Sequence, residues 1–213
     1  MNIAIIGANG VSGSLILKEA VDRGHDVTAI VRDASKISAA NVAVIEKDLF
    51  DLTGADLRPF DVVVSAFKAP IGQETLYLDS SVALAAALQD APDTKLIVVG
   101  GAGSLFVDAD STSLLMDTPD FPDFVYPTAF NAGKQLEHLR QTDSLTWTYI
   151  SPAAFFDPEG PRTGSYRKGK DHVIPNAQGD SYVSYADFAI AVLDEIEHPQ
   201  HVNERFTVVS DKK

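Results

Sequence analysis

The chain contains no cysteine, and it has only one tryptophan and two methionines among its 213 residues. Without cysteine it cannot form disulfide bonds, thiolate metal sites or iron–sulfur clusters, and it has no thiol nucleophile. Any redox chemistry therefore depends on a bound cofactor.

Basic residues are scarce, with 17 Lys and Arg against 30 Asp and Glu and a formal net charge of -13. A surface this negative repels nucleic-acid backbones and anionic lipids, and no run of Lys and Arg forms a basic patch. We therefore expect no nucleic-acid partner and no membrane partner.

Long apolar runs are missing as well. None reaches the roughly 18 to 20 residues of a membrane-spanning helix, and the first residues lack the charged and apolar segments of a signal peptide. We expect a soluble, cytoplasmic protein. A chain of this length with 45% apolar residues can bury one large core, so residues 1–213 are predicted to form one domain.

Short apolar runs rich in β-branched residues alternate with helical patterns along the chain. Strands that alternate with helices form a parallel sheet covered on both faces. The sequence therefore predicts an α/β protein with a Rossmann-type doubly wound parallel sheet. We expect strands at residues 3–6, 27–31, 42–45, 62–64, 96–99, 147–150 and 206–209, and helices at residues 11–23, 74–89, 128–140 and 185–198.

Two stretches interrupt this alternation. Residues 104–127 have no clear period and are predicted to form a long loop with about one turn of helix. Residues 152–180 are rich in Gly and Pro and contain a basic cluster, which fits either an anionic ligand or a solvated loop; the cluster is Arg162, Arg167, Lys168 and Lys170. We expect residues 151–183 to form a small C-terminal subregion on the substrate side.

The first predicted strand runs directly into a glycine-rich turn that opens the first helix. A diphosphate needs exposed backbone N–H groups at a helix N-terminus and a chain without Cβ obstruction. In this interpretation Gly7 permits the tight turn, Gly10 permits close approach, and Gly13 lets the helix pack on the strand. Asn9 and Val11 complete the predicted dinucleotide-binding turn.

Arg32 follows the second predicted strand, where NAD-binding proteins usually carry an acidic residue for the ribose. A guanidinium there would pair with a 2′-phosphate, so NADP(H) is favoured over NAD(H). Two alternatives remain open. Asp33 could bind a ribose hydroxyl, and Arg32 could be a surface charge.

Small or polar residues follow the other strands, where ligands bind in open α/β sheets. Each also fits an ordinary turn. The predicted cofactor contacts are Asp48 and Leu49 at the adenine, Ser65, Ala66 and Phe67 at the ribose and diphosphate, and Gly100, Gly101 and Ala102 near the nicotinamide.

These motifs resemble those of atypical short-chain dehydrogenase/reductases, in particular the NAD(P)H-flavin reductase subgroup related to biliverdin-IXβ/flavin reductase and to NmrA-like proteins. The resemblance covers most of the chain and rests on residues 7–13, 31–32, 48–49, 98–104, 151–153 and 162–166. The chain departs from the family pattern at Asn9, where the family usually has Thr. It implies Pro152 as a further cofactor contact and a monomer or homodimer.

Classical members of this superfamily use a Tyr-x-x-x-Lys pair for proton transfer. The matching stretch here is Phe130 to Lys134, which lacks the hydroxyl. Lys134 then either holds the nicotinamide ribose or is an exposed helix lysine. Flavin reduction fits this absence because water can supply the proton and catalysis depends on holding two rings in contact.

The resemblance therefore implies an NADPH-dependent reductase acting on a flavin, quinone or similar planar acceptor, with no metal. The alternative is a non-catalytic NADP(H)-binding redox sensor of the NmrA type. Predicted catalytic residues are Ser104, Lys134 and Tyr126, and predicted substrate contacts are Phe155, Arg162 and Tyr166. Core packing remains an alternative for each aromatic, and His172 is a candidate for a histidine role found in flavin reductases.

Overall fold

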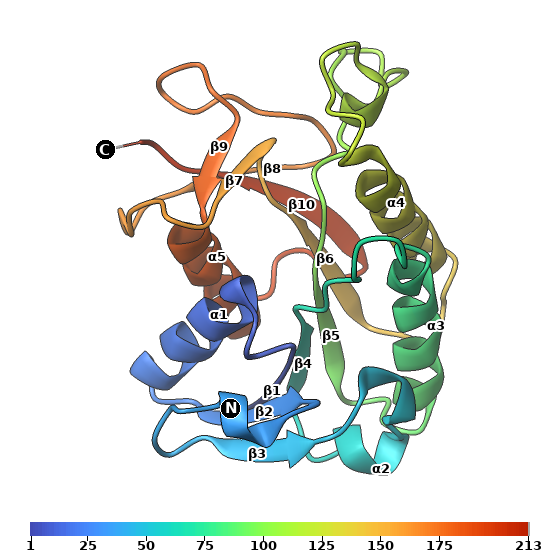
Figure 1. The fold of residues 1–213 in the computed structure, drawn as a ribbon, viewed down its shortest axis with the longest axis vertical. Helices are drawn as coiled ribbons and strands as arrows, with labels where there is room; N and C mark the ends of the chain where they lie inside the picture. The colour runs from blue at the N-terminus through green and yellow to red at the C-terminus, as the bar shows by residue number, and fades with distance from the viewer. Residues whose placement is uncertain (213) are drawn as a thin grey trace.

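A computed structural model describes residues 1–212, which fold around a mostly parallel eight-stranded sheet (Figure 1). The strand order is β3-β2-β1-β4-β5-β6-β10-β8, and only β8 runs antiparallel to its neighbour. The strands are β1 (Asn2–Ile6), β2 (Asp26–Val31), β3 (Ala43–Glu46), β4 (Val62–Ser65), β5 (Lys95–Val99), β6 (Trp147–Ser151), β8 (Arg167–Gly169) and β10 (Glu204–Val209). The predicted Rossmann-type doubly wound sheet is confirmed.

Helices cover both faces of this sheet (Figure 1). The helices are α1 (Val11–Asp22), α2 (Gly54–Leu57), α3 (Leu76–Gln89), α4 (Tyr126–Arg140) and α5 (Tyr185–Glu197), and the 3-10 turns are η1 (Ala34–Lys36), η2 (Leu49–Asp51) and η3 (Leu115–Asp117). Helices α1 and α5 pack on one face, and α3 and α4 pack on the other.

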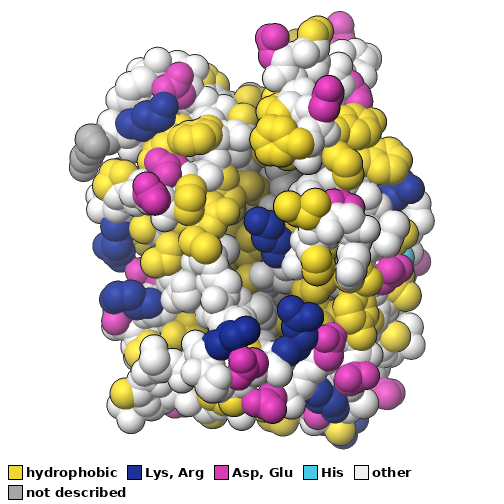
Figure 2. Space-filling model, viewed as in Figure 1, with side chains coloured by type: hydrophobic (Ala, Val, Ile, Leu, Met, Phe, Trp, Pro, Cys, Tyr) yellow, Lys and Arg dark blue, Asp and Glu magenta, His cyan; other side chains and the backbone are white. Residues whose placement is uncertain are grey.

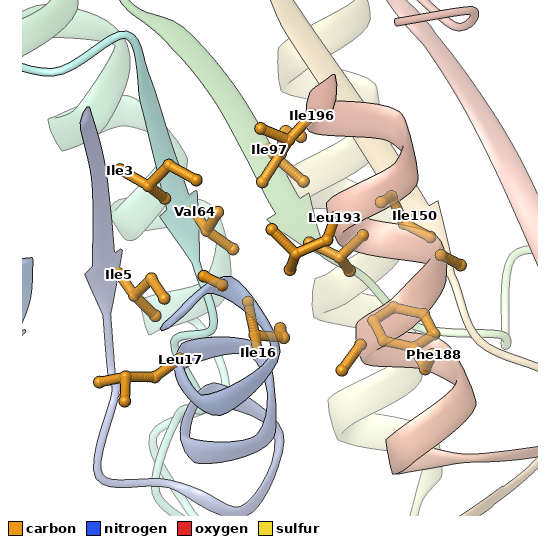
Figure 3. Packing of buried hydrophobic residues seen from close by; sticks show 14 of the residues in the cluster. Ile3, Ile5, Ile16, Leu17, Val64, Ile97, Ile150, Phe188, Leu193 and Ile196 are labelled. Carbon is orange, nitrogen blue, oxygen red and sulfur yellow. The ribbon is translucent and has the colours of Figure 1, made fainter. Parts of the chain in front are cut away.

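The core on the α1 and α5 face is continuous across the middle strands (Figure 3). Ile16 of α1 and Phe188 of α5 are both fully buried. They lie over strand side chains such as Ile5 and Ile150, and Leu84, Leu88 and Leu136 bury the opposite face. Because both faces are covered, the strand ends and the loops beyond them are the natural places for a ligand.

The two interrupted stretches differ from each other in the structure. Residues 104–127 form a long loop with one 3-10 turn, η3, as predicted, although α4 begins at Tyr126 with a proline in its first turn. Residues 152–180 are more ordered than predicted, because β7 (Phe155–Asp157) pairs with β9 (Tyr182–Ser184) and β8 joins the main sheet. Strands of three residues are too short to produce a recognisable period.

The start of α5 ties the C-terminal subregion to the core. Ser184 accepts a hydrogen bond from the Asp187 N–H at 3.0 Å. The Asp187 carboxylate accepts from the Thr163 hydroxyl and from the N–H groups of Thr163 and Gly164, at 2.8 to 3.0 Å. Asp187 therefore holds the 163–164 loop against the start of α5.

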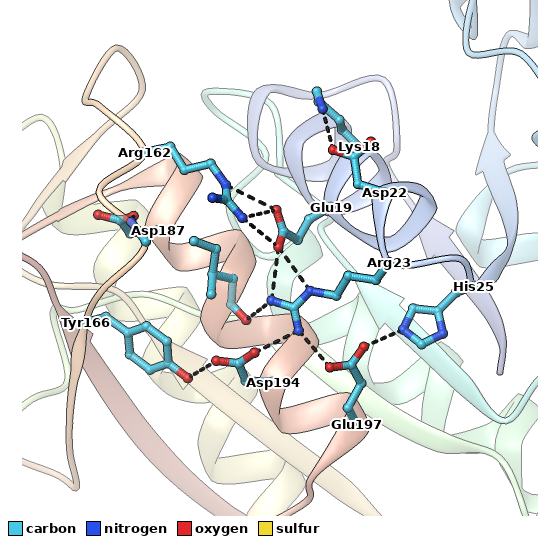
Figure 4. A network of polar contacts seen from close by, with 12 residues as sticks. Lys18, Glu19, Asp22, Arg23, His25, Arg162, Tyr166, Asp187, Asp194 and Glu197 are labelled. Atoms are coloured by element: carbon cyan, nitrogen blue, oxygen red, sulfur yellow. Dashed lines mark hydrogen bonds and ion pairs between the residues drawn. The ribbon is translucent and has the colours of Figure 1, made fainter.

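An ionic network joins α1 to α5 on the outer side of that core (Figure 4). Arg23 donates to Glu19 at 3.0 Å, to Asp194 at 2.7 Å and to Glu197 at 2.8 Å. Its side chain is only 20% exposed. The three carboxylates converge on one guanidinium, so its removal leaves them repelling one another.

We expect Arg23→Met to lower the free energy of unfolding by about 2–4 kcal/mol, because removing the guanidinium leaves partly buried carboxylates without their cationic partner. Urea denaturation at pH 7 measures this. Lys18→Met is the matched control on the same helix: Lys18 and Asp22 form an exposed pair, and such pairs contribute no more than about 1 kcal/mol. Equal losses in the two variants would contradict the proposed role of the network.

Candidate functional site

A cleft of two adjoining cavities lies at the carboxyl edge of the sheet, at the point where the strand order reverses. The strands β1 and β4 are parallel neighbours there, but the strand after β1 lies on one side of this pair and the strand after β4 lies on the other. The β2-side cavity, about 220 Å³, is lined by the ends of β1, β2 and β3. The β5-side cavity, about 320 Å³, is lined by the ends of β5 and β6 and by α4 and Tyr185. Both are lined by Ala66, Phe67 and Lys68, so one cleft passes over the end of β4.

Figure 2 shows this face of the molecule, with a hollow bordered by hydrophobic side chains and with Lys and Arg side chains in and below it. The loops after β5 and the β7–β9 region rise on the two sides (Figure 1). The cleft therefore combines basic groups with apolar walls.

The turn between β1 and α1 contains glycines with different roles. Gly7 has φ of +75°, and a Cβ there would lie 2.8 Å from the carbonyl oxygen of Ala66. A Cβ on Gly13 would lie 2.2 Å from the carbonyl oxygen of Gly7. At Gly10 the nearest atom would be 3.2 Å away, and φ is negative. The fold therefore requires glycine at positions 7 and 13 but much less at position 10.

Gly10 is also the N-cap of α1, and no side chain within residues 1–212 caps this helix. The N–H groups of a first helical turn have no partners within the helix. Gly7, Asn9 and Gly10 line the β2-side cavity, whereas Val11 lines neither cavity and is 57% exposed. The turn therefore presents open backbone and helix N–H donors beside a cavity, as a phosphate site requires.

Three cations line the β2-side cavity: Arg32, Lys47 and Lys68. Lys47 pairs with Asp56 at 2.7 Å. Arg32 and Lys68 are exposed, and neither side chain forms a hydrogen bond or ion pair within residues 1–212. Two charged groups thus remain available to an anion.

The acidic residues near Arg32 are engaged in local turns. The Asp33 carboxylate accepts from the Ser35 N–H at 3.1 Å and the Ser35 hydroxyl at 2.6 Å, and these bonds hold the pKa of Asp33 below its usual value. Asp33 does not line the cavity. Asp48 lines it together with Leu49, and its carboxylate accepts from the Phe50 N–H at 3.0 Å.

The β5-side cavity is mostly apolar and aromatic, and Gly100, Gly101, Ala102 and Pro152 form part of its wall. Tyr149 supports this wall from below. A Cβ on Gly100 would lie 2.0 Å from its ring, and its hydroxyl accepts from the Gly101 N–H at 3.1 Å and donates to the Ala132 carbonyl at 3.0 Å. Burial raises the pKa of Tyr149 to about 12, so the phenol keeps its proton at neutral pH.

The predicted catalytic residues lie outside this cleft. Ser104 and Lys134 line a separate cavity of about 440 Å³ with Arg205, and Arg205 donates to the Ser104 hydroxyl at 2.8 Å. The Lys134 ammonium lies 4.4 Å from the centre of the Phe130 ring, and Tyr126 stacks on that same ring with centroids 6.0 Å apart. The structure does not bring Ser104, Lys134 and Tyr126 to the cleft.

The orientation of α4 explains the positions of Phe130 and Lys134. Successive residues of an α-helix turn by about 100°, so only one side of α4 meets the cleft. That side carries Thr128, Ala129 and Ala132, and Val125, the residue before the helix, lines the cleft with them. Phe130 and Lys134 have the spacing of Tyr-x-x-x-Lys, but they lie on the side of α4 that lines the separate cavity.

The predicted substrate residues also lie elsewhere. Phe155 is 55% exposed and stacks toward Tyr182, while the next residue, Phe156, lines the cavity. Arg162 pairs with Glu19 at 3.0 Å, and Tyr166 donates to Asp194 at 2.7 Å, both within the α1–α5 network (Figure 4). These contacts correct the anionic-ligand interpretation of Arg162.

Ser65 and His172 do not line the cleft either. Ser65 is 1% exposed. His172 lies against the Phe106 ring and the Ser111 hydroxyl. Sequence reasoning missed several polar and aromatic cleft residues, and of these Lys47 and Lys68 lie near predicted strand ends; they include Lys47, Lys68, Tyr77, Phe121, Thr128, Phe156 and Tyr185.

No group of three or more His, Asp or Glu side chains within residues 1–212 is arranged to bind a metal ion. In the same part of the chain, every helix is too short or too polar to span a membrane.

Comparisons with known proteins extend over nearly the whole chain. A family model described as NAD(P)H-binding matches residues 7–199. An uncharacterized protein of Bacillus subtilis (strain 168), YwnB, is 64% identical over 211 residues, which are 99% of each chain.

Two solved structures share the fold closely. One, from Streptococcus pneumoniae TIGR4 and described as a putative NADH-flavin reductase, is 42% identical with a TM-score of 0.93, covering 99% of this chain and 100% of that one. Another, described as a putative epimerase from Bacteroides thetaiotaomicron, is 34% identical with a TM-score of 0.88. The match covers 100% of this chain and 99% of that one.

Proposed function

Because the chain belongs to the NAD(P)H-binding family, we propose that it is an NADPH-dependent oxidoreductase that reduces a flavin, quinone or similar planar acceptor. The observation that carries this proposal is the cleft itself, in which a cationic cavity with open backbone adjoins an aromatic cavity at Ala66, Phe67 and Lys68. The bound dinucleotide would supply a hydride from its nicotinamide.

The β2-side cavity is proposed to hold the adenosine and diphosphate. Gly10 allows the diphosphate to approach the N–H donors of α1 without obstruction. Arg32 binds the 2′-phosphate, and Lys68 adds positive charge where the two cavities meet. Gly7 and Asn9 line the turn, and Asp48 and Leu49 line the adenine end.

The β5-side cavity is proposed to hold the nicotinamide and the acceptor. Gly100, Gly101, Ala102 and Pro152 form the wall beside the nicotinamide. Aromatic residues of the same cavity supply apolar surface for a conjugated ring; they are Phe121, Phe156 and Tyr185. The protein contributes chiefly by holding two rings together and excluding water.

We expect the purified protein to oxidise NADPH, followed at 340 nm, with at least one acceptor from a panel of FMN, FAD and quinones. NADPH should be preferred to NADH because Arg32 and Lys68, which have no ion-pair partner within residues 1–212, line the β2-side cavity. Binding of NADPH without oxidation by any acceptor would contradict the reductase and favour the redox-sensor alternative. No binding of either cofactor would contradict both.

A further inference from the structure

Four side chains with hydroxyl groups line the β5-side cavity: Ser12, Tyr77, Thr128 and Tyr185. They differ in how accessible their oxygens are. The Ser12 hydroxyl is inaccessible to solvent, and Tyr77 is only 8% exposed. Thr128 and Tyr185 are half-buried at the cavity wall. These two are the hydroxyls that a bound acceptor can meet.

Tyr185 holds a defined position because it is the first residue of α5. The Phe156 ring lies 3.6 Å from its ring, measured between centroids. Phe156 in turn contacts the buried Phe188 ring at 4.9 Å. Asp187 fixes the same helix end to Thr163 and Gly164. A group held in this way by core packing is preorganised for a reaction.

The Tyr185 hydroxyl makes no hydrogen bond within residues 1–212, although it lines a cavity. Other tyrosine hydroxyls in this half of the protein are engaged: Tyr149 with Ala132, Tyr166 with Asp194 and Tyr182 with Asp157. The Tyr185 phenol is therefore a fixed donor without an acceptor in residues 1–212. Burial raises its pKa above the ordinary value, so it carries its proton at neutral pH.

Resting on the proposed function, we propose that Tyr185 is a catalytic residue whose phenol donates a hydrogen bond, and then a proton, to a carbonyl oxygen or ring nitrogen of the acceptor. Hydride from the nicotinamide reduces the acceptor by two electrons and leaves the oxidised dinucleotide. The phenol O–H bond breaks as an O–H or N–H bond forms on the acceptor. Water then returns a proton to the phenolate. The acceptor is accordingly a planar ring with a proton-accepting heteroatom that becomes more basic on reduction.

The test is Tyr185→Phe, which keeps the ring and removes the hydroxyl. We expect kcat with a quinone acceptor to fall about 100-fold, in the range of general acid catalysis. The Kd for NADPH, measured by fluorescence without acceptor, should not change. The Kd for the acceptor, measured without NADPH, should rise several-fold because a hydrogen bond is lost. In the wild type, kcat should decline at alkaline pH as the phenol ionises, and the variant should lack this decline.

Tyr126→Phe is the matched control, because Tyr126 is 40% exposed and outside the cleft. It should behave as the wild type. Thr128→Val tests the other accessible hydroxyl on the wall. Wild-type rates and acceptor affinity in Tyr185→Phe would overturn the proposal, as would a loss confined to Thr128→Val. If no acceptor of the panel supports NADPH oxidation by the wild type, the proposed function is overturned, and this proposal with it.

Discussion

Replacing Arg32 by alanine is expected to raise the Kd for NADPH about 10- to 100-fold while leaving the Kd for NADH within about 3-fold. Arg32 lines the β2-side cavity, and its guanidinium has no ion-pair partner within residues 1–212. A charge-assisted hydrogen bond contributes about 1.5–3 kcal/mol, and each 1.4 kcal/mol is a factor of ten in affinity. Isothermal titration with the two cofactors measures both constants.

Lys36→Ala serves as the control for this experiment. Lys36 is exposed on η1, lies 3.6 Å from the Asp33 carboxylate and does not line the cavity. Removing its charge changes the local field without removing a proposed phosphate contact, so neither constant should change by more than about 2-fold. If Arg32→Ala weakened both cofactors equally, the 2′-phosphate assignment would be wrong and Arg32 would act through general attraction.

The second large effect concerns the glycines of the β1–α1 turn. Gly13→Ala is expected to lower the free energy of unfolding by roughly 4 kcal/mol or more, among the largest effects of single substitutions. Its Cβ would lie 2.2 Å from the Gly7 carbonyl oxygen and 2.8 Å from the Gly7 carbonyl carbon. These are backbone atoms, so α1 would have to move off the sheet.

Gly10→Ala should separate binding from folding. Its Cβ meets only the Gly7 carbonyl oxygen, at 3.2 Å, so stability in urea should change by no more than about 1 kcal/mol. The methyl group would stand where the diphosphate approaches the N–H donors of α1, and both NADPH and NADH should bind at least about 10-fold more weakly. Unchanged cofactor binding in a folded Gly10→Ala protein would show that the diphosphate does not approach this turn.

Sequence patterns identified residues that line the β2-side cavity because these residues follow strands directly. Gly7, Arg32 and Asp48 are separated along the chain, yet each comes just after a parallel strand, and parallel strands end at the same edge of a sheet. Buried runs such as residues 3–6 and 96–99 identify those strands without reference to distant contacts.

The aromatic lining of the β5-side cavity could not be predicted in the same way. Tyr126 and Tyr185 both begin helices, and only the packing of α4 and α5 on the sheet decides that Tyr185 enters the cleft and Tyr126 does not. The face of α4 that carries Lys134 is likewise set by tertiary packing. Arg162 looks like an anion-binding residue in sequence because its partner, Glu19, lies 143 positions away.

In the proposed binding mode, one NADP(H) molecule crosses the end of β4 from the β2-side cavity to the β5-side cavity. A crystal structure of the protein with NADP⁺ tests this most directly. We predict the 2′-phosphate beside Arg32, the diphosphate at Gly10 and the nicotinamide between Gly100 to Ala102 and Tyr185. A dinucleotide bound outside this cleft, or one whose nicotinamide lies beside Arg32, would contradict the proposed binding mode.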